Sequence, residues 1–167
     1  MISPSAPIAR RVIAAALLTV ASSASVGAQL TSARAEPELR VDVLGGRGAS
    51  VQLGAGMQIP AGTYVRVGIL GGVGPRWVDG SSRTDGRIDV LARFLLDPFR
   101  QSRWGLSAGG GVSLRASSGD RVRPNLLAAL DLEGPRARSG VSPTIQFGLG
   151  GGVRAGLGLR WGTRGAR

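Results

Sequence analysis

The segment at residues 153–161 constrains the fold of this chain more than any other. Apolar residues occupy every second position, and arginine or glycine fills the positions between them. The apolar set is Val153, Ala155, Leu157, Leu159 and Trp161, and the intervening set is Arg154, Gly156, Gly158 and Arg160. A period of two indicates a β-strand with one apolar face and one polar face.

The same alternation recurs along the chain and predicts eight strands. Their ranges are 38–43, 49–59, 64–69, 87–94, 103–115, 125–133, 144–150 and 153–161. Glycine, proline, serine and aspartate separate the strands, and the segment Gly74–Thr84 is expected to be a long loop. Since runs of alternating residues separated by turns are typical of membrane barrels, we expect an all-β, eight-stranded antiparallel up-and-down transmembrane barrel.

The first 28 residues have the pattern of a secretory signal peptide. Arg10 and Arg11 precede the apolar run Val12–Val20, and small residues lead to Val26-Gly27-Ala28. The apolar run is too short to span a bilayer as a helix. The sequence therefore predicts a signal peptide at 1–28, a flexible lead-in at 29–36, the barrel at 37–163 and a C-terminal tail at 164–167.

Composition limits the chemistry that this chain can perform. It has 167 residues with 21 basic and 10 acidic side chains, and it contains neither histidine nor cysteine. The usual general base and the common thiolate and imidazole metal ligands are therefore missing, so we expect no catalytic residues, no cofactor and no metal. The net charge of +11 suits an anionic membrane surface or an acidic glycolipid. With an export signal present, nucleic acid is not an expected partner.

Alternation alone leaves open what the apolar face meets, because a soluble β-sandwich or barrel gives a similar pattern. Two features favour lipid. The polar face is rich in glycine, which suits the narrow interior of an eight-stranded barrel. Phe94, Trp104 and Trp161 fall near one end of the expected barrel, as interfacial aromatic residues do. A membrane protein without a spanning helix must be a closed barrel.

Charges of both signs lie on the polar face and are expected to form an interior network. Its members are Glu38, Arg40, Asp42, Arg66, Arg87, Asp89, Arg93, Arg103, Asp131, Glu133, Arg154 and Arg160. Charges in a narrow interior must be paired, because each unpaired charge costs several kcal/mol. Barrel closure predicts that Glu38 pairs with Arg160 and that Asp42 lies towards Arg154. Arg103 is expected to meet Asp131 or Glu133. In a soluble protein the same charges would be solvated.

The C-terminal strand also carries a short motif. Arg154, Gly156, Leu159 and Trp161 follow the order polar, glycine, apolar, aromatic at the spacing of the assembly signal of small outer-membrane barrels. With the eight strands and the export signal, the chain resembles the OmpA-transmembrane-domain and OmpX-like group of Gram-negative bacteria. The resemblance implies a porin-like fold, an outer-membrane location and recognition by the barrel-assembly machinery. Unlike the group, this chain continues beyond the aromatic residue and has short outer loops.

Three functions from different classes follow. The leading expectation is a non-catalytic, monomeric outer-membrane barrel that supports envelope integrity or interacts through its surface loops. Arg47, Arg76, Arg83 and Arg121 lie on the expected outer loops and could contact acidic glycolipid, although solvated loop charges also account for them. The alternatives are a secreted soluble β-protein that binds a small ligand and an outer-membrane lipid-modifying enzyme. Barrels that modify lipid A use a histidine beside a serine, and this chain has no histidine.

Overall fold

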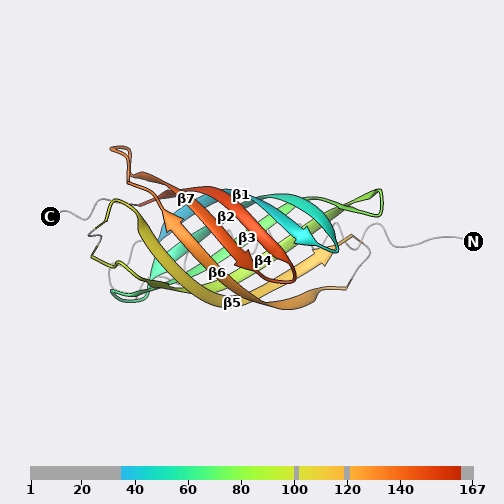
Figure 1. The fold of residues 1–167 in the computed structure, drawn as a ribbon, viewed down its shortest axis with the longest axis horizontal. Helices are drawn as coiled ribbons and strands as arrows, with labels where there is room; N and C mark the ends of the chain where they lie inside the picture. Colours follow the sequence, from blue (N-terminus) through green and yellow to red (C-terminus); the bar gives the residue numbers. More distant parts are fainter. Residues whose placement is uncertain (1–34, 100–101, 119–120, 163–167) are drawn as a thin grey trace, which may run out of the picture. The chain divides into compact units, whose positions relative to one another are not determined.

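The computed structural model describes residues 35–99, 102–118 and 121–162. The expected signal peptide, most of the lead-in and the C-terminal tail lie outside these residues. The strands are β1 Glu36–Gly46, β2 Gly48–Pro60, β3 Val65–Val78, β4 Ser81–Leu95, β5 Gly105–Ser117, β6 Arg123–Glu133, β7 Val141–Leu149 and β8 Val153–Trp161. They form a closed barrel in sequence order, shown in Figure 1, with antiparallel neighbours. The predicted all-β eight-stranded barrel is confirmed.

Pairing between the first and last strands closes the barrel. Their register runs from Glu38 opposite Arg160 to Gly45 opposite Val153, so neither strand is left as a sheet edge. With an even number of strands, β1 begins and β8 ends at the same end of the barrel, which we call the terminal end. The β1–β2, β3–β4, β5–β6 and β7–β8 connections lie at the opposite end, which we call the turn end.

The predicted long loop at Gly74–Thr84 is wrong. Strands β3 and β4 continue through it and pair up to Val78 opposite Ser81, which leaves only Asp79 and Gly80 between them. Both turn residues have positive φ, 48° and 74°, as a type I′ hairpin turn requires. The glycine, proline and serine residues that indicated a loop belong instead to the outer ends of two long strands.

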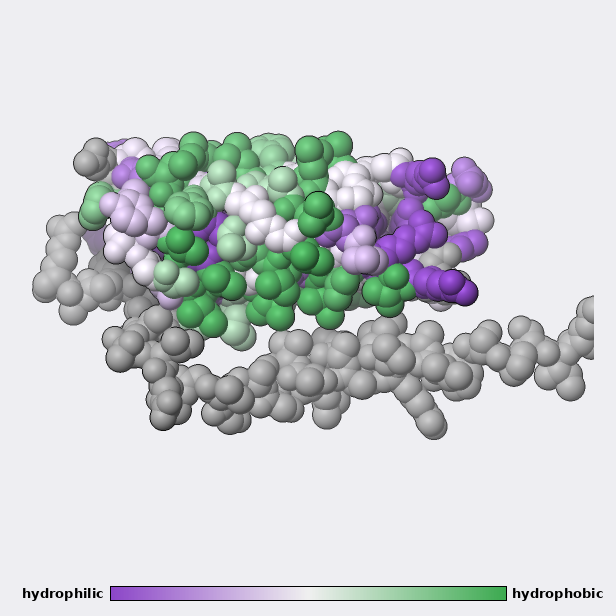
Figure 2. Space-filling view, turned by 90° about the horizontal axis from the view of Figure 1, so that it is seen from below, coloured by the Kyte–Doolittle hydropathy of each residue, from purple (hydrophilic) through white to green (hydrophobic). Residues whose placement is uncertain are grey.

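Side chains on the two faces of the barrel have opposite polarity. Large apolar residues point outward, and Leu53 and Leu157 are each 65% exposed. Arginines, carboxylates and glutamines fill the interior, where Asp42 is 0% exposed and Arg160 2%. In Figure 2 hydrophobic side chains cover the middle of the visible face, and hydrophilic ones gather at the end that lies right in both views, the turn end. The described residues contain no helix long and apolar enough to cross a membrane.

Glycines make the narrow interior possible. Gly109 and Gly111 of β5 face the backbone of β4 so closely that a Cβ at either position would overlap the carbonyl oxygen of Ala92 or Val90. Glycine at these positions therefore leaves the barrel room to close around its charged side chains.

Candidate functional site

The barrel interior holds a set of ion pairs and hydrogen bonds between charged side chains, which we call the interior network. Among the described residues it contains seven carboxylates and eight arginines, each within 4.0 Å of an opposite charge. The carboxylates are Glu36, Glu38, Asp42, Asp85, Asp89, Asp131 and Glu133, and the arginines are Arg40, Arg66, Arg87, Arg93, Arg115, Arg136, Arg154 and Arg160. The two signs nearly balance, as buried charges require.

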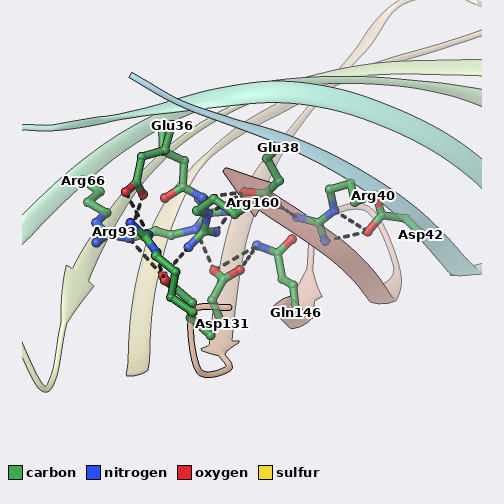
Figure 3. A network of polar contacts seen from close by, with 12 residues as sticks. Glu36, Glu38, Arg40, Asp42, Arg66, Arg93, Asp131, Gln146 and Arg160 are labelled. Atoms are coloured by element: carbon green, nitrogen blue, oxygen red, sulfur yellow. Dashed lines mark hydrogen bonds and ion pairs between the residues drawn. The ribbon is translucent and has the colours of Figure 1, made fainter. Parts of the chain in front are cut away.

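Arg160 organises the network near the terminal end. Its Nη2 lies 2.9 Å from Oε2 of Glu38 and its Nη1 lies 2.8 Å from Oε2 of Glu133, so one guanidinium joins β1 to β6. Arg66 of β3 also reaches Glu133, at 3.1 Å, and Arg136 reaches Glu36, at 3.0 Å. Figure 3 shows Arg66 of β3 and Arg160 of β8 directed towards Glu36 and Glu38 of β1.

Asp131 holds the next group along the barrel. Arg93 Nε lies 2.6 Å from Asp131 Oδ2, and the amide of Gln146 donates to both oxygens of the same carboxylate at 2.9 and 3.0 Å. The carbonyl oxygen of Gln146 in turn accepts from Arg154 Nη2 at 2.6 Å. Because the glutamine both donates and accepts, it extends the network between charged residues that do not touch.

Asp42 and Asp89 lie closer to the turn end. Asp42 accepts from Arg40 at 2.6 Å and is also in close contact with Arg87. Asp89 is 2.7 Å from Arg154 and 3.1 Å from Arg87. Each arginine here pairs with a carboxylate on another strand, with one two residues away on the same strand, or with both. The contacts therefore run both across the lumen and along single strands.

The structure brings Glu38 and Arg160 together as opposite residues on β1 and β8. The expected approach of Asp42 to Arg154 is wrong, because Arg154 lies opposite Leu44 and its side chain reaches Asp89 instead. In a lumen this narrow a long arginine side chain spans to a distant strand, so a neighbour in register is not necessarily its partner.

The expected role of Arg103 is also wrong. Strand β5 begins at Gly105, and Arg103 is exposed in the bend before it. In the register, Gly105 and Ser107 stand opposite Glu133 and Asp131 and offer them no positive charge. These carboxylates pair instead with arginines of other strands. The other eleven residues expected in the network belong to it.

Sequence reasoning missed four charged members of the network. Glu36 and Asp85 share the alternation of Glu38 and Arg87, but one was placed in the lead-in and the other next to the expected loop. Arg115 lies at the outer part of β5, where it meets Asp85 at 2.7 Å. Arg136 follows β6 in a connection and turns back into the barrel, which strand alternation does not reveal.

The expected interfacial aromatic residues lie at the terminal end. Phe94 is 60% exposed near the end of β4, and Trp104 is exposed just before β5. Trp161, half-buried, ends β8 opposite Val141. Tyr64 and Phe99 extend this set through an edge-to-face contact with ring centroids 6.3 Å apart. Both lie in connections at the terminal end, so strand alternation could not reveal their contact.

The C-terminal motif divides between the two faces of β8. Arg154 and Gly156 are buried in the interior, whereas Leu159 is exposed on the outside. A Cβ on Gly156 would occupy the space of the Asp42 carboxylate and the Arg40 guanidinium. The glycine of the motif therefore also has a local structural role, since it leaves room for an ion pair of β1.

The paired charges leave little free space in the middle of the barrel. A cavity lined in part by Glu38, Gln58 and Arg93 has a volume of about 10 Å³, which is at or below the room that one water needs. The interior at this level is therefore a packed polar core.

No protein-family model and no curated protein sequence matches this chain. Its structure is similar to the crystal structure of Neisserial surface protein A, with a TM-score of 0.56, 11% identity, and coverage of 76% of this chain and 94% of that one. It also matches the designed barrel TMB2.3, with a TM-score of 0.45, 12% identity, and coverage of 81% and 99%. The likeness to the Neisserial protein concerns the fold, and at that level it agrees with the resemblance of the sequence to small outer-membrane barrels.

Proposed function

We propose that this chain is a non-catalytic outer-membrane β-barrel protein that supports the envelope or interacts through its turn end. The observation that carries the proposal is the inverted polarity of the barrel. Large apolar side chains point outward from every strand pair, while the buried side chains are mostly charged or amide-bearing. In water this arrangement would expose the apolar face and bury the costly charges, whereas in lipid the apolar face is solvated by hydrocarbon.

Strand length supports a membrane-spanning barrel. The eight strands contain between 9 and 15 residues, and a tilted strand needs about 9–11 residues to cross the hydrocarbon core. The aromatic residues at the terminal end suit a membrane–water interface. In this arrangement the terminal end faces the periplasm and the turn end faces outward.

The proposal includes the expected partners. The outer strand face contacts lipid, the C-terminal strand is recognised by the barrel-assembly machinery, and the protein acts as a monomer. Arg47, Arg76 and Arg83, all towards the turn end, would contact acidic glycolipid of the outer leaflet, together with Arg121. Export through the predicted signal peptide belongs to the same proposal.

The competing functions receive less support from the geometry. A soluble ligand-binding barrel would bury most of its leucines and valines, and here most of them are exposed on the outside. For a lipid-modifying enzyme, Ser107 lies opposite Asp131 in the register, but that carboxylate is engaged by Arg93 and Gln146. Both oxygens of Asp131 are therefore occupied by partners other than the serine.

An arginine placed on the outer face tests the proposal. Leu157 is 65% exposed and pairs with Val41 and Ile145 in the middle of β8. In a bilayer, L157R should lower the free energy of unfolding by about 2–4 kcal/mol, because the arginine charge must enter hydrocarbon. The control S82R places the same charge at an exposed position near the β3–β4 turn and should have little effect.

The chain is expressed in a Gram-negative host with its own N-terminus, recovered from membranes and compared by urea unfolding in lipid vesicles. Recovery in the outer-membrane fraction with heat-modifiable gel migration supports the proposal. Recovery as a water-soluble protein, with L157R as stable as S82R, contradicts it.

A further inference from the structure

The turn end of the barrel opens into a cavity whose charge differs from that of the interior network. The cavity has a volume of about 230 Å³. It is lined by Arg47, Arg76, Asp85, Arg115, Ser117, Arg121, Arg123, Asn125 and Gly151. Among these residues five arginines face one aspartate, which leaves an excess of four positive charges. We call this cavity the arginine mouth.

Asp85 at the base of the mouth is fully committed to its neighbours. Its Oδ2 accepts from Arg115 at 2.7 Å and from Gln52 at 2.9 Å, and its Oδ1 accepts from Ser117 at 2.7 Å. Since the Asp85 carboxylate is 1% exposed, it is not available to pair with the arginines at the rim. Arg76 is fixed next to this group by bonds to the Ser117 hydroxyl at 3.2 Å and to the Arg47 carbonyl at 2.8 Å.

The remaining arginines have no acidic neighbour in the part of the chain that the structure describes. Arg47, Arg121 and Arg123 are exposed at the rim, and none of them forms an ion pair with a described carboxylate. The contrast with the interior network is direct, because every arginine there meets at least one carboxylate. With Arg76, which bonds only to a hydroxyl and a carbonyl group, four guanidinium groups around this cavity have no carboxylate partner among the described residues, and they create a positive potential there.

The sheet register strengthens this contrast. Arg115 and Arg123 stand directly opposite each other on β5 and β6. Like charges at opposite positions of an antiparallel pair are destabilising unless a counter-charge lies between them. Inside the barrel, the opposed Arg66 and Arg93 each have a carboxylate partner, Glu133 and Asp131. At the mouth, Asp85 pairs with Arg115, and Arg123 has no ion pair with a described carboxylate.

We propose that the arginine mouth binds a phosphate-bearing anion. A phosphate group offers several acceptor oxygens, and guanidinium groups bind them through paired, charge-assisted hydrogen bonds. A volume of about 230 Å³ admits a phosphate or a pyrophosphate group with part of its hydration. The anion would supply a counter-charge to Arg47, Arg121 and Arg123, which have none among the residues that the structure describes. The site shares Arg47, Arg76 and Arg121 with the proposed glycolipid contact and so rests on that part of the proposed function. A failure to bind phosphate would leave the inverted polarity of the barrel, which carries the proposed function, unaffected.

The test uses the full chain folded in an uncharged detergent, with binding measured by isothermal titration at constant ionic strength. One arm titrates inorganic phosphate and pyrophosphate, and the other titrates micelles doped with phosphatidic acid against micelles doped with phosphatidylcholine. Binding in the first arm identifies a free phosphate compound, and binding in the second arm alone identifies a lipid headgroup. Either result supports the site.

The variants R121Q and R123Q remove rim charges that take no part in the interior network. Each should weaken binding about tenfold, since each removes a charge-assisted hydrogen bond to the anion. The matched controls R103Q and R138Q remove the same charge from exposed positions at the terminal end and should leave affinity within a factor of two or so.

Equal losses in the rim variants and the controls would show a general effect of net charge and would overturn the proposal. The absence of binding by the unaltered protein in both arms would overturn it as well. Should a rim variant not fold, thermal unfolding of the unaltered protein decides. Pyrophosphate should raise the unfolding temperature more than chloride at equal ionic strength, and an equal rise contradicts the site.

Discussion

At the scale of single residues, packing of the narrow interior requires that the size of each side chain fits the small space available to it. Gly156 is the clearest case, because the atoms of Asp42 and Arg40 lie where its Cβ would be. A strand glycine usually weakens a sheet, yet here Gly156 of β8 leaves room for the Arg40–Asp42 ion pair of the neighbouring strand β1. The abundance of glycine on the polar face thus has a direct cause in packing.

G156A should therefore destabilise the barrel by about 1–3 kcal/mol, the usual cost of overpacking a filled core. The control is G71A, because a Cβ on Gly71 meets nothing closer than the Ala55 carbonyl oxygen at 4.0 Å. Urea unfolding in lipid vesicles measures both variants. If G156A and G71A unfold at the same urea concentration, the interior is looser than the structure indicates.

Arg160 provides a second prediction at this scale. It is buried between Glu38 and Glu133, so R160M leaves both carboxylates with fewer counter-charges. Removing one partner of a buried ion pair costs about 3–5 kcal/mol. The exposed Arg103 serves as the control, and R103M should change stability by less than about 0.5 kcal/mol.

The double variant E38Q/R160M should recover part of the lost stability, because it also removes the negative charge that lost one of its two arginine partners. A double variant that is as unstable as the sum of its single changes would argue against the Glu38–Arg160 contact. Chemical unfolding of the four proteins under one set of conditions gives the coupling energy.

At the scale of elements, the strand pattern was predictable and the strand ends were not. Alternation identified all eight strands because outward and inward faces differ in polarity over many residues. It misplaced the outer parts of β3 and β4, where Gly74 and Pro75 resemble turn residues but are still paired with β4. The side-chain partners were less predictable. Arg154 pairs with Asp89 of β4, which is not its neighbour in register, and Asp131 pairs with Arg93 of β4 in addition to its register neighbour Gln146.

The β6–β7 seam gives a prediction at the element scale. Strand β6 pairs with β7 only from Ala128 to Glu133, whereas it pairs with β5 from Arg123 onward. The segment 123–127 therefore has strand neighbours on one side only. Apolar residues and glycines line an open depression there, including Leu126, which is 86% exposed.

Amides of residues 123–127 that point towards β7 should exchange with solvent faster than those of 128–133, because no carbonyl group of β7 protects them. Hydrogen exchange of the folded protein in micelles, read by NMR, measures both groups. The β1–β2 seam, paired from Glu36 to Gly46, serves as the internal reference for full protection. Uniform slow exchange along β6 would mean that β7 extends further in solution.

At the scale of the whole molecule, a membrane barrel requires that its apolar face points outward. Val112 and Ser113 are neighbours on β5 with opposite environments, 44% and 1% exposed. Since the chain contains no cysteine, a single cysteine at either position can carry a probe without interference. A bulky label attached before folding should be accepted at Val112 and should block folding at Ser113, while unlabelled S113C still folds.

The most direct measurement is the quenching of a bimane label on V112C by brominated acyl chains in lipid vesicles. If the side chain at position 112 lies in hydrocarbon, quenching should be strong. It should weaken when the bromine sits at an acyl-chain position whose depth differs from that of the label. An unquenched label on a folded protein that stays in the aqueous phase would contradict this placement.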